Sequence, residues 1–216
     1  MSQGPPEPAF DDAFRARLHD LFVWRRDVRR FTAEPLADGV LQRLLDAAHL
    51  APSVGLSQPW RFVLVESPER RAAVADCFRI CNREALEAYA PDHAADYARL
   101  KLEGLREAPC HLAVFADPST AQGRGLGRRT MPEMIEYSVV AAICNLWLAA
   151  RAEGMGVGWV SILDPARVAE ILDTPPHWRL IGYLCIGHPA SHDHSPELER
   201  AGWERRRPVA NHVFRR

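Results

Sequence analysis

The sequence of 216 residues lacks several features that would place it in a specialised class of protein. Its first ten residues, MSQGPPEPAF, contain no apolar stretch like that of a secretion signal. The longest apolar run, around 139–150, is interrupted by Asn145 and Trp147 and is too short to span a bilayer. The five cysteines are odd in number and have no disulfide spacing, which is typical of a reducing compartment. We therefore expect a cytoplasmic protein that does not contact a membrane.

Charge and metal ligands are also unremarkable. A formal net charge of −1 gives no reason to expect nucleic acid as a partner, so any anion site must come from local clustering. Cys77 and Cys81 are one helical turn apart, but no further ligands stand near them in sequence, so buried thiols are favoured over a metal pair. His192 and His194 lie in a polar tail without partner spacing, so we expect no metal.

The apolar pattern predicts one domain over 10–216, in which helices and strands alternate loosely around a long central helix buried on most sides, preceded by a flexible lead-in over 1–9. The polar helical region that ends at 107 is typical of a lid or a peripheral hairpin, and we expect an extension over 191–216 that packs on a partner subunit. Asp38 is the expected N-cap of the second helix. Strands are predicted over 61–66, 111–116, 159–163 and 179–187, and helices over 10–24, 39–50, 68–89, 93–107, 132–154 and 165–172.

Arginines gather immediately after the first predicted helix, at positions 25, 26, 29 and 30. Guanidinium groups offer forked donors that match a phosphate, so this cluster is a candidate anion site. The alternative is a solvated basic turn that offsets the dipole of the helix C-terminus. Asp27 lies inside the cluster, where neighbouring cations favour its ionised form. It could pair with an arginine structurally, accept a hydrogen bond or act as a base.

Two loops could line a ligand. Ala51–Trp60 (APSVGLSQPW) offers two hydroxyls, an amide and an indole, although a turn that places Trp60 in the core explains it equally well. The glycines of Gly154–Gly158 let a backbone pass close to a planar ligand. This second loop leads into a strand and opens no helix, so it is not a dinucleotide fingerprint. The Gly-rich run 123–129 is interpreted as a mobile loop, and no hydrolase elbow is present.

These segments together resemble the nitroreductase-like flavoprotein superfamily over residues 10–214. The matching motifs are Arg25–Phe31, Pro52–Trp60, a long helix at Met134–Glu153, the turn Gly154–Gly158, and Arg206 before Arg207-Pro208. Within the superfamily, the chain is most similar to the 5,6-dimethylbenzimidazole synthase branch. The distinguishing residue is Asp27, where ordinary nitroreductases tend to have Ser, and the supporting segments are 51–62, 125–137 and 145–163.

The resemblance implies an α+β fold with a central, mainly antiparallel sheet flanked by helices, in an intertwined homodimer with FMN at the interface. It also implies that the segment at about 85–107 is a lid. It implies Asp27 and Ser161 as catalytic residues: Asp27 as a base or proton relay, and Ser161 as a hydrogen-bond donor to a flavin oxygen. The residues that it implies for FMN binding are Arg25, Arg26, Asp27, Val28, Arg29, Ser53, Ser57, Gly158, Trp159, Ser161 and Arg206.

The branch implies a reaction in which reduced FMN is itself the substrate. Dioxygen is the co-substrate, and the products are 5,6-dimethylbenzimidazole, the lower ligand of cobalamin, and erythrose 4-phosphate. Reduced FMN would come from a separate flavin reductase or a free pool, and the lid would close over the site. One alternative is an NAD(P)H-dependent FMN nitroreductase or dehalogenase. A second is a flavin-binding protein without catalytic activity.

Overall fold

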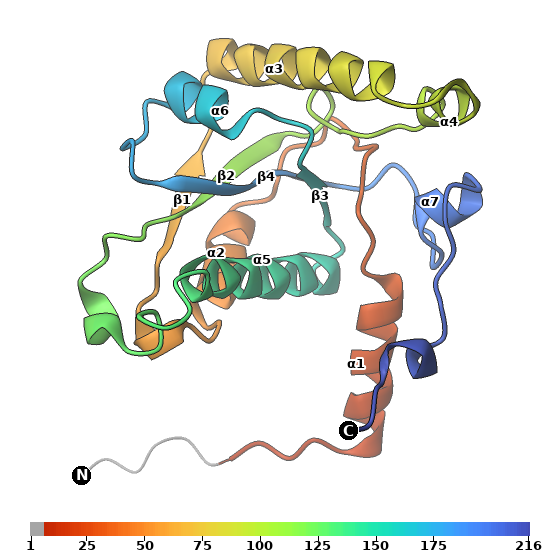
Figure 1. Cartoon of the computed structure of the whole chain (residues 1–216). Coiled ribbons are helices and arrows are strands. Elements are labelled where there is room, and N and C mark those ends of the chain that lie inside the picture. Colours follow the sequence, from red (N-terminus) through yellow and green to blue (C-terminus); the bar gives the residue numbers. More distant parts are fainter. Residues whose placement is uncertain (1–6) are drawn as a thin grey trace.

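A four-stranded antiparallel sheet in the order β1-β2-β4-β3 is the centre of the fold in the computed structural model, which describes residues 7–216 (Figure 1). Its strands are β1 (Trp60–Leu64), β2 (Cys110–Ala116), β3 (Gly156–Val160) and β4 (Arg179–Gly187). Every residue of β2 is buried, as expected for a central strand covered on both faces. The predicted α+β class and antiparallel sheet are confirmed.

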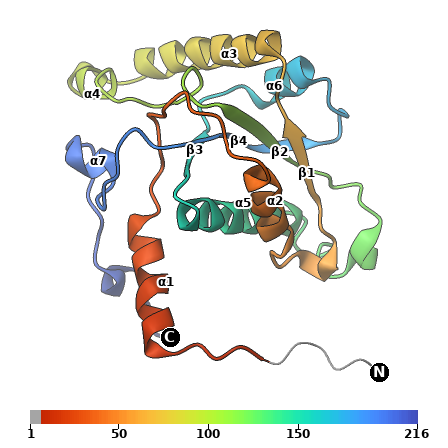
Figure 2. The ribbon, with the colours of Figure 1, turned by 180° about the vertical axis from the view of Figure 1, so that it is seen from behind.

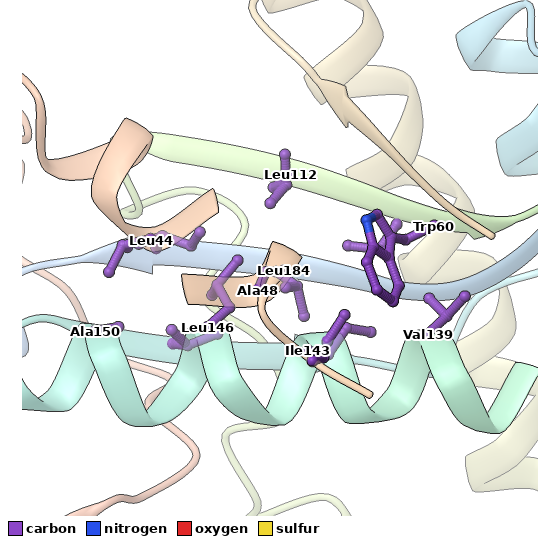
Figure 3. Close-up of a cluster of buried hydrophobic side chains, with 14 of the residues drawn as sticks. Leu44, Ala48, Trp60, Leu112, Val139, Ile143, Leu146, Ala150 and Leu184 are labelled. Carbon is purple, nitrogen blue, oxygen red and sulfur yellow. The ribbon is translucent and has the colours of Figure 1, made fainter. Parts of the chain in front are cut away.

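Helices cover both faces of this sheet. On one face lie α2 (Val40–His49) and α5 (Met134–Ala152), and on the other lie α3 (Pro68–Glu87) and α6 (Pro165–Leu172) (Figures 1 and 2). Side chains alternate between the faces along each strand. Leu112 and Leu184 therefore face α5, where they pack with Leu44 of α2 and Ile143 of α5 (Figure 3). This core fixes α5 against the sheet.

Helix α1 (Asp12–Trp24) is not part of this core. It extends away from the sheet, has no buried residue among its thirteen, and contacts α5 (Figures 1 and 2). The C-terminal tail contains α7 (Glu197–Arg200) and a 3-10 turn η3 (Val209–His212), and its end lies beside α1 (Figures 1 and 2). Residues 204–216 are exposed, so the packing of the tail on a partner stays a prediction.

Three local predictions were wrong. Gly39, with φ of 78°, occupies the N-cap of α2, and no side chain caps that helix, so Asp38 is not its cap. Strand β3 starts at Gly156, because its first residues pair with the end of β4, Gly156 with Gly187 and Val157 with Ile186. The predicted second lid helix ends at Tyr97, as α4 (Pro91–Tyr97), because the backbone of 98–107 is bound by side chains instead: Lys101 by Arg29 and Leu105 by Glu103.

Helix α5 is also different from its prediction. Its 19 residues are long and apolar enough to cross a membrane by length and composition, which the interrupted run did not suggest. A core helix passes the same test, and α5 packs one face against the sheet. The other face includes the exposed Tyr137 and Cys144, so the helix is not buried on most sides within this one chain.

Candidate functional site

The arginine segment is attached to the edge of the sheet by its backbone. Asp27 forms a parallel bridge with Val157, and the Val28 amide donates to the Val157 carbonyl at 3.0 Å. A Cβ atom on Gly158 would lie 2.2 Å from the Val28 carbonyl oxygen, so only glycine permits this approach. The glycine in this turn thus leaves room for the arginine segment to lie against β3. Pairing with β3 fixes the position of the arginines.

Asp27 holds this segment in place with both carboxylate oxygens. Oδ1 accepts from the backbone amide of Trp159 at 2.9 Å, and Oδ2 accepts from Nε of Arg29 at 2.9 Å. The Arg29 side chain is only 13% exposed, and its Nη1 donates to the Lys101 carbonyl at 2.8 Å. Arg29 therefore connects Asp27 to the lid segment. The Asp27 side chain remains 31% exposed, and each carboxylate oxygen can accept a further hydrogen bond.

Three other arginines, Arg25, Arg26 and Arg206, gather beside the carboxylates of Glu199 and Asp193. Arg26 donates to the carbonyls of Phe22 and Val23 at the end of α1, and its Nε is buried without a partner among residues 7–216. Burial, and then the positive charges of Arg25 and Arg206, lower the pKa of Arg26, while Glu199 and Asp193 oppose this. Because an anion offsets the repulsion between neighbouring cations, this group is a candidate anion site.

Arg25 lies on an aromatic surface. Its guanidinium carbon is 4.8 Å from the ring centroid of Trp147 on α5, and the Trp147 indole Nε1 donates to the Arg26 carbonyl at 3.1 Å. The ring of Trp159 lies 6.1 Å from that of Trp147. In the sequence, Trp147 is recognisable only as an interruption of an apolar run. An amphipathic indole at such an interruption was the available signal that the residue has a polar partner.

The loop with the two predicted serines lies against the other half of α5. The backbone amide of Val54 donates to Ser138 of α5 at 3.0 Å, and Ser53 Oγ accepts from the Gln58 amide at 3.1 Å. Ser57 is 1% exposed, and its hydroxyl has no partner among residues 7–216. An open pocket of about 750 Å³ lies between this loop and the Gly-rich run 122–130.

The predicted site residues therefore form two groups. Residues 25–28 lie together with Gly158, Trp159 and Arg206, whereas Ser53 and Ser57 lie elsewhere. Ser138 and Trp147, which contact the two groups, are nine residues apart on α5, or roughly 14 Å along the helix axis. Ser161 follows the end of β3 and is exposed.

The cysteine and histidine pairs form no metal centre in the described part of the chain. Cys77 and Cys81 are free, and residues 7–216 contain no group of three or more side chains that could hold a metal ion. Burial, followed by the neighbouring Cys77, raises the pKa of the Cys81 thiol. These cysteines are packing residues of α3.

Comparison with known proteins identifies the family. The family model described as "Nitroreductase family" matches residues 22–188, from the end of α1 to the residue after β4. The chain belongs to the nitroreductase family. The match contains the arginine segment, the 53–58 loop and β3, so both groups of predicted site residues, apart from Arg206, fall inside it.

Individual members of the nitroreductase family resemble the chain closely. The 5,6-dimethylbenzimidazole synthase of Rhodospirillum rubrum is 57% identical over 202 residues, which are 93% of this chain and 95% of that protein. A synthase of the same name from Rhodobacter capsulatus is 45% identical over 93% of this chain and 97% of that one. A solved structure of iodotyrosine deiodinase bound to FMN and 3-iodo-L-tyrosine is 29% identical, covers 82% of this chain and 91% of that one, and has a TM-score of 0.66.

Proposed function

We propose that this chain is a 5,6-dimethylbenzimidazole synthase, an oxidoreductase that converts reduced FMN and dioxygen into 5,6-dimethylbenzimidazole, erythrose 4-phosphate and a further product that carries the remaining carbons and nitrogens of the flavin's pyrimidine ring. The product is the lower ligand of cobalamin. The observation that supports this most directly is 57% identity with a synthase of that name along almost the whole of both chains. The deiodinase is less similar, and its structure supports FMN as the ligand of the fold.

The arginine group suits the phosphate of FMN. Arg25, Arg26 and Arg206 bring three positive charges together, and the buried Nε of Arg26 lacks an acceptor within 7–216. A phosphate offers several acceptor oxygens and negative charge, which meets both needs. Arg29 was also expected to bind the phosphate or ribityl chain. Two of its donors already have partners in Asp27 and Lys101, so we propose that it positions Asp27 instead.

A homodimer accounts for the separation of the two groups. We propose that the 53–57 loop of one copy completes the flavin site of the other, next to its arginine segment. Helix α1 has no buried residue and exposes Phe22 and Trp24, as expected of a helix that packs on a second copy.

The reaction needs proton acceptors and donors beside the flavin, which supplies the electrons that dioxygen receives. Asp27 is one candidate, because its carboxylate is held at two points and still has lone pairs and exposure. Ser161 is the other, because its exposed hydroxyl can donate to an oxygen atom of the ligand. We propose that the enzyme acts in the cytoplasm and receives reduced FMN from a flavin reductase or a free pool.

The test is a product analysis. The full-length protein is mixed anaerobically with chemically reduced FMN, exposed to air, and analysed by chromatography for flavin and 5,6-dimethylbenzimidazole. We expect the benzimidazole to accumulate as flavin is lost, and only oxidised FMN to form in a protein-free sample. Reoxidation to intact FMN with no benzimidazole would overturn the proposal.

A second arm distinguishes the alternatives on the same scaffold. NAD(P)H oxidation is followed with a nitroaromatic or iodotyrosine as acceptor. Rapid, FMN-sparing turnover would identify a nitroreductase or dehalogenase. No turnover in this arm, together with simple reoxidation in the first, would identify a flavin-binding protein.

A further inference from the structure

We propose that Trp147 is the residue that positions Arg25 for the phosphate of FMN and so selects the phosphorylated flavin. The inference rests on the proposed flavin site and adds to it a side chain from α5 that is not among the predicted site residues. Three contacts converge on Trp147: Arg25 on its ring, the Arg26 carbonyl on its indole nitrogen, and Trp159 beside it.

Arg25 depends on this ring because it has no other side-chain anchor. Within residues 7–216, no carboxylate pairs with Arg25 and no hydrogen bond from its guanidinium is found, whereas Arg29 has Asp27 and Arg30 has Glu197. Arg25 lies close enough to Arg26 to interact with it unfavourably, as Arg206 also does. The electron-rich face of an indole attracts a guanidinium without taking its hydrogen-bond donors. Trp147 thus holds Arg25 in place and leaves its donors available for a phosphate.

Trp147 also fixes the backbone that follows. Helix α1 has no buried residue to anchor it, and its last turn must be placed by contacts at its C-terminal end. The hydrogen bond from Trp147 Nε1 to the Arg26 carbonyl is one of these contacts. A second is made by Arg151, one turn further along α5, whose guanidinium lies 5.9 Å from the ring of Trp24. The hydrogen bond from Trp147 thus fixes the backbone position of Arg26, just before the segment reaches Asp27 and pairs with β3.

A role in binding the phosphate can be tested by comparing flavins with and without a phosphate. Riboflavin has the isoalloxazine ring and the ribityl chain of FMN but no phosphate. If Trp147 acts through Arg25, loss of the ring must weaken FMN and leave riboflavin almost unaffected. If Trp147 only supports the fold, both flavins must weaken together.

The experiment measures dissociation constants of oxidised FMN and riboflavin by flavin fluorescence, with the full-length protein and two variants. Trp147→Phe keeps an aromatic face for Arg25 and removes the indole donor, whereas Trp147→Leu removes both. For Trp147→Leu we expect FMN to bind about tenfold more weakly and riboflavin to change by less than about twofold. Trp147→Phe should fall between wild type and Trp147→Leu for FMN.

A matched control comes from the opposite end of the sheet. The ring of Trp178 lies 5.9 Å from the guanidinium of Arg61, and Trp178 is half-buried like Trp147. Trp178→Leu therefore removes a comparable cation–π pair away from the arginine cluster, and the ratio of FMN to riboflavin affinity should stay at the wild-type value. A fall in that ratio equal to that of Trp147→Leu would overturn the inference.

A double-mutant cycle with Arg25→Met tests whether Trp147 affects FMN affinity through Arg25. If Trp147 acts through Arg25, then Trp147→Leu should change FMN affinity by less than about twofold once Arg25 is replaced. Fully additive losses would refute the coupling. Because oxidised flavin binding involves no turnover, an absence of dimethylbenzimidazole would refute the proposed function and leave this result standing, and the converse also holds.

Discussion

At the scale of single residues, the structural role of Asp27 and its proposed role in proton transfer can be tested separately. An asparagine at position 27 keeps one oxygen that can accept from the Trp159 amide. Its NH2 group would face Arg29, which is also a donor, and Arg29 loses its counter-ion. For Asp27→Asn we predict a free energy of unfolding lower by about 1–2 kcal/mol and loss of dimethylbenzimidazole formation, with FMN still bound. Chemical denaturation, flavin titration and product chromatography measure the three quantities.

Asp117 provides the control for Asp27. It too accepts from a backbone amide, that of Ser119, and pairs with an arginine, Arg61. Asp117→Asn should cost similar stability and leave product formation intact. If Asp27→Asn made the product at the wild-type rate, a role for Asp27 in proton transfer would be excluded.

Ser161, unlike Asp27, has no structural role to separate from a chemical one. Its side chain is exposed and has no hydrogen-bond partner within the described residues. Removing its hydroxyl should therefore leave the fold alone. For Ser161→Ala we predict a change in unfolding free energy within about 0.5 kcal/mol and at least a tenfold slower appearance of dimethylbenzimidazole. Equal rates in both proteins would remove Ser161 from the reaction.

At the scale of elements, the close approach of the arginine segment to β3 depends on Gly158. Its missing side chain leaves room for the Val28 carbonyl, 2.2 Å from where a Cβ atom would lie. Gly158→Ala must force the two backbones apart. We predict a loss of about 2 kcal/mol or more in unfolding free energy and weaker FMN binding.

Gly154 separates this steric effect from ordinary backbone strain. Its φ is 78° but no atom lies within 4 Å of a Cβ built there. Gly154→Ala should cost about 1 kcal/mol, the price of left-handed backbone alone, and leave FMN affinity unchanged. Comparable flavin-binding defects in both variants would contradict the explanation.

The elements that sequence alone predicts are those specified by local pattern. The near-continuous apolar runs of 111–116 and 179–187 and the long apolar helix are found close to their expected bounds. The start of β3 and the end of the lid helix were missed, because the first depends on pairing with β4 and the second on a contact with Arg29, both distant in sequence. Family resemblance selected Asp27 as important, but its bond to Trp159, 132 residues later, is visible only in three dimensions.

The residues of the site were also only partly predictable from the sequence. A cluster of arginines in sequence indicated an anion site, yet the positions did not reveal that Arg29 faces Asp27 while Arg25 faces Trp147. Local sequence specifies which charges are available. Packing of α1 against α5 and pairing with β3 decide which of them remain free to bind a ligand.

At the scale of the whole molecule, a buried histidine couples stability to pH. His111 on β2 is 1% exposed and lies between the sheet and α3, with its Nδ1 3.0 Å from the Tyr183 hydroxyl. Burial, and then the charge of Arg71 on α3, lower the pKa of His111 from its usual value of 6.5 to about 4. Between these two values the unfolded chain binds the proton more readily, so stability falls as pH falls from 6.5 to 4.

The expected loss across this interval is about 3 kcal/mol if His111 acts alone. Chemical denaturation at pH 7 and pH 4.5 measures it. His111→Gln should be less stable at pH 7 and depend less on pH in this window, and His19→Gln, on exposed α1, should follow wild type. The histidine assignment fails if His111→Gln and wild type lose stability in parallel.

The gathering of Arg25, Arg26 and Arg206 has a further consequence for the lifetime of the protein. Their mutual repulsion opposes the folded state unless an anion lies between them, so a ligand that binds only the folded chain stabilises it in proportion to its free concentration. If that ligand is also the substrate, each turnover destroys the enzyme's own stabiliser. The abundance of the protein would then follow the supply of reduced flavin, and a cell starved of flavin would clear the enzyme through its proteases without any dedicated regulator.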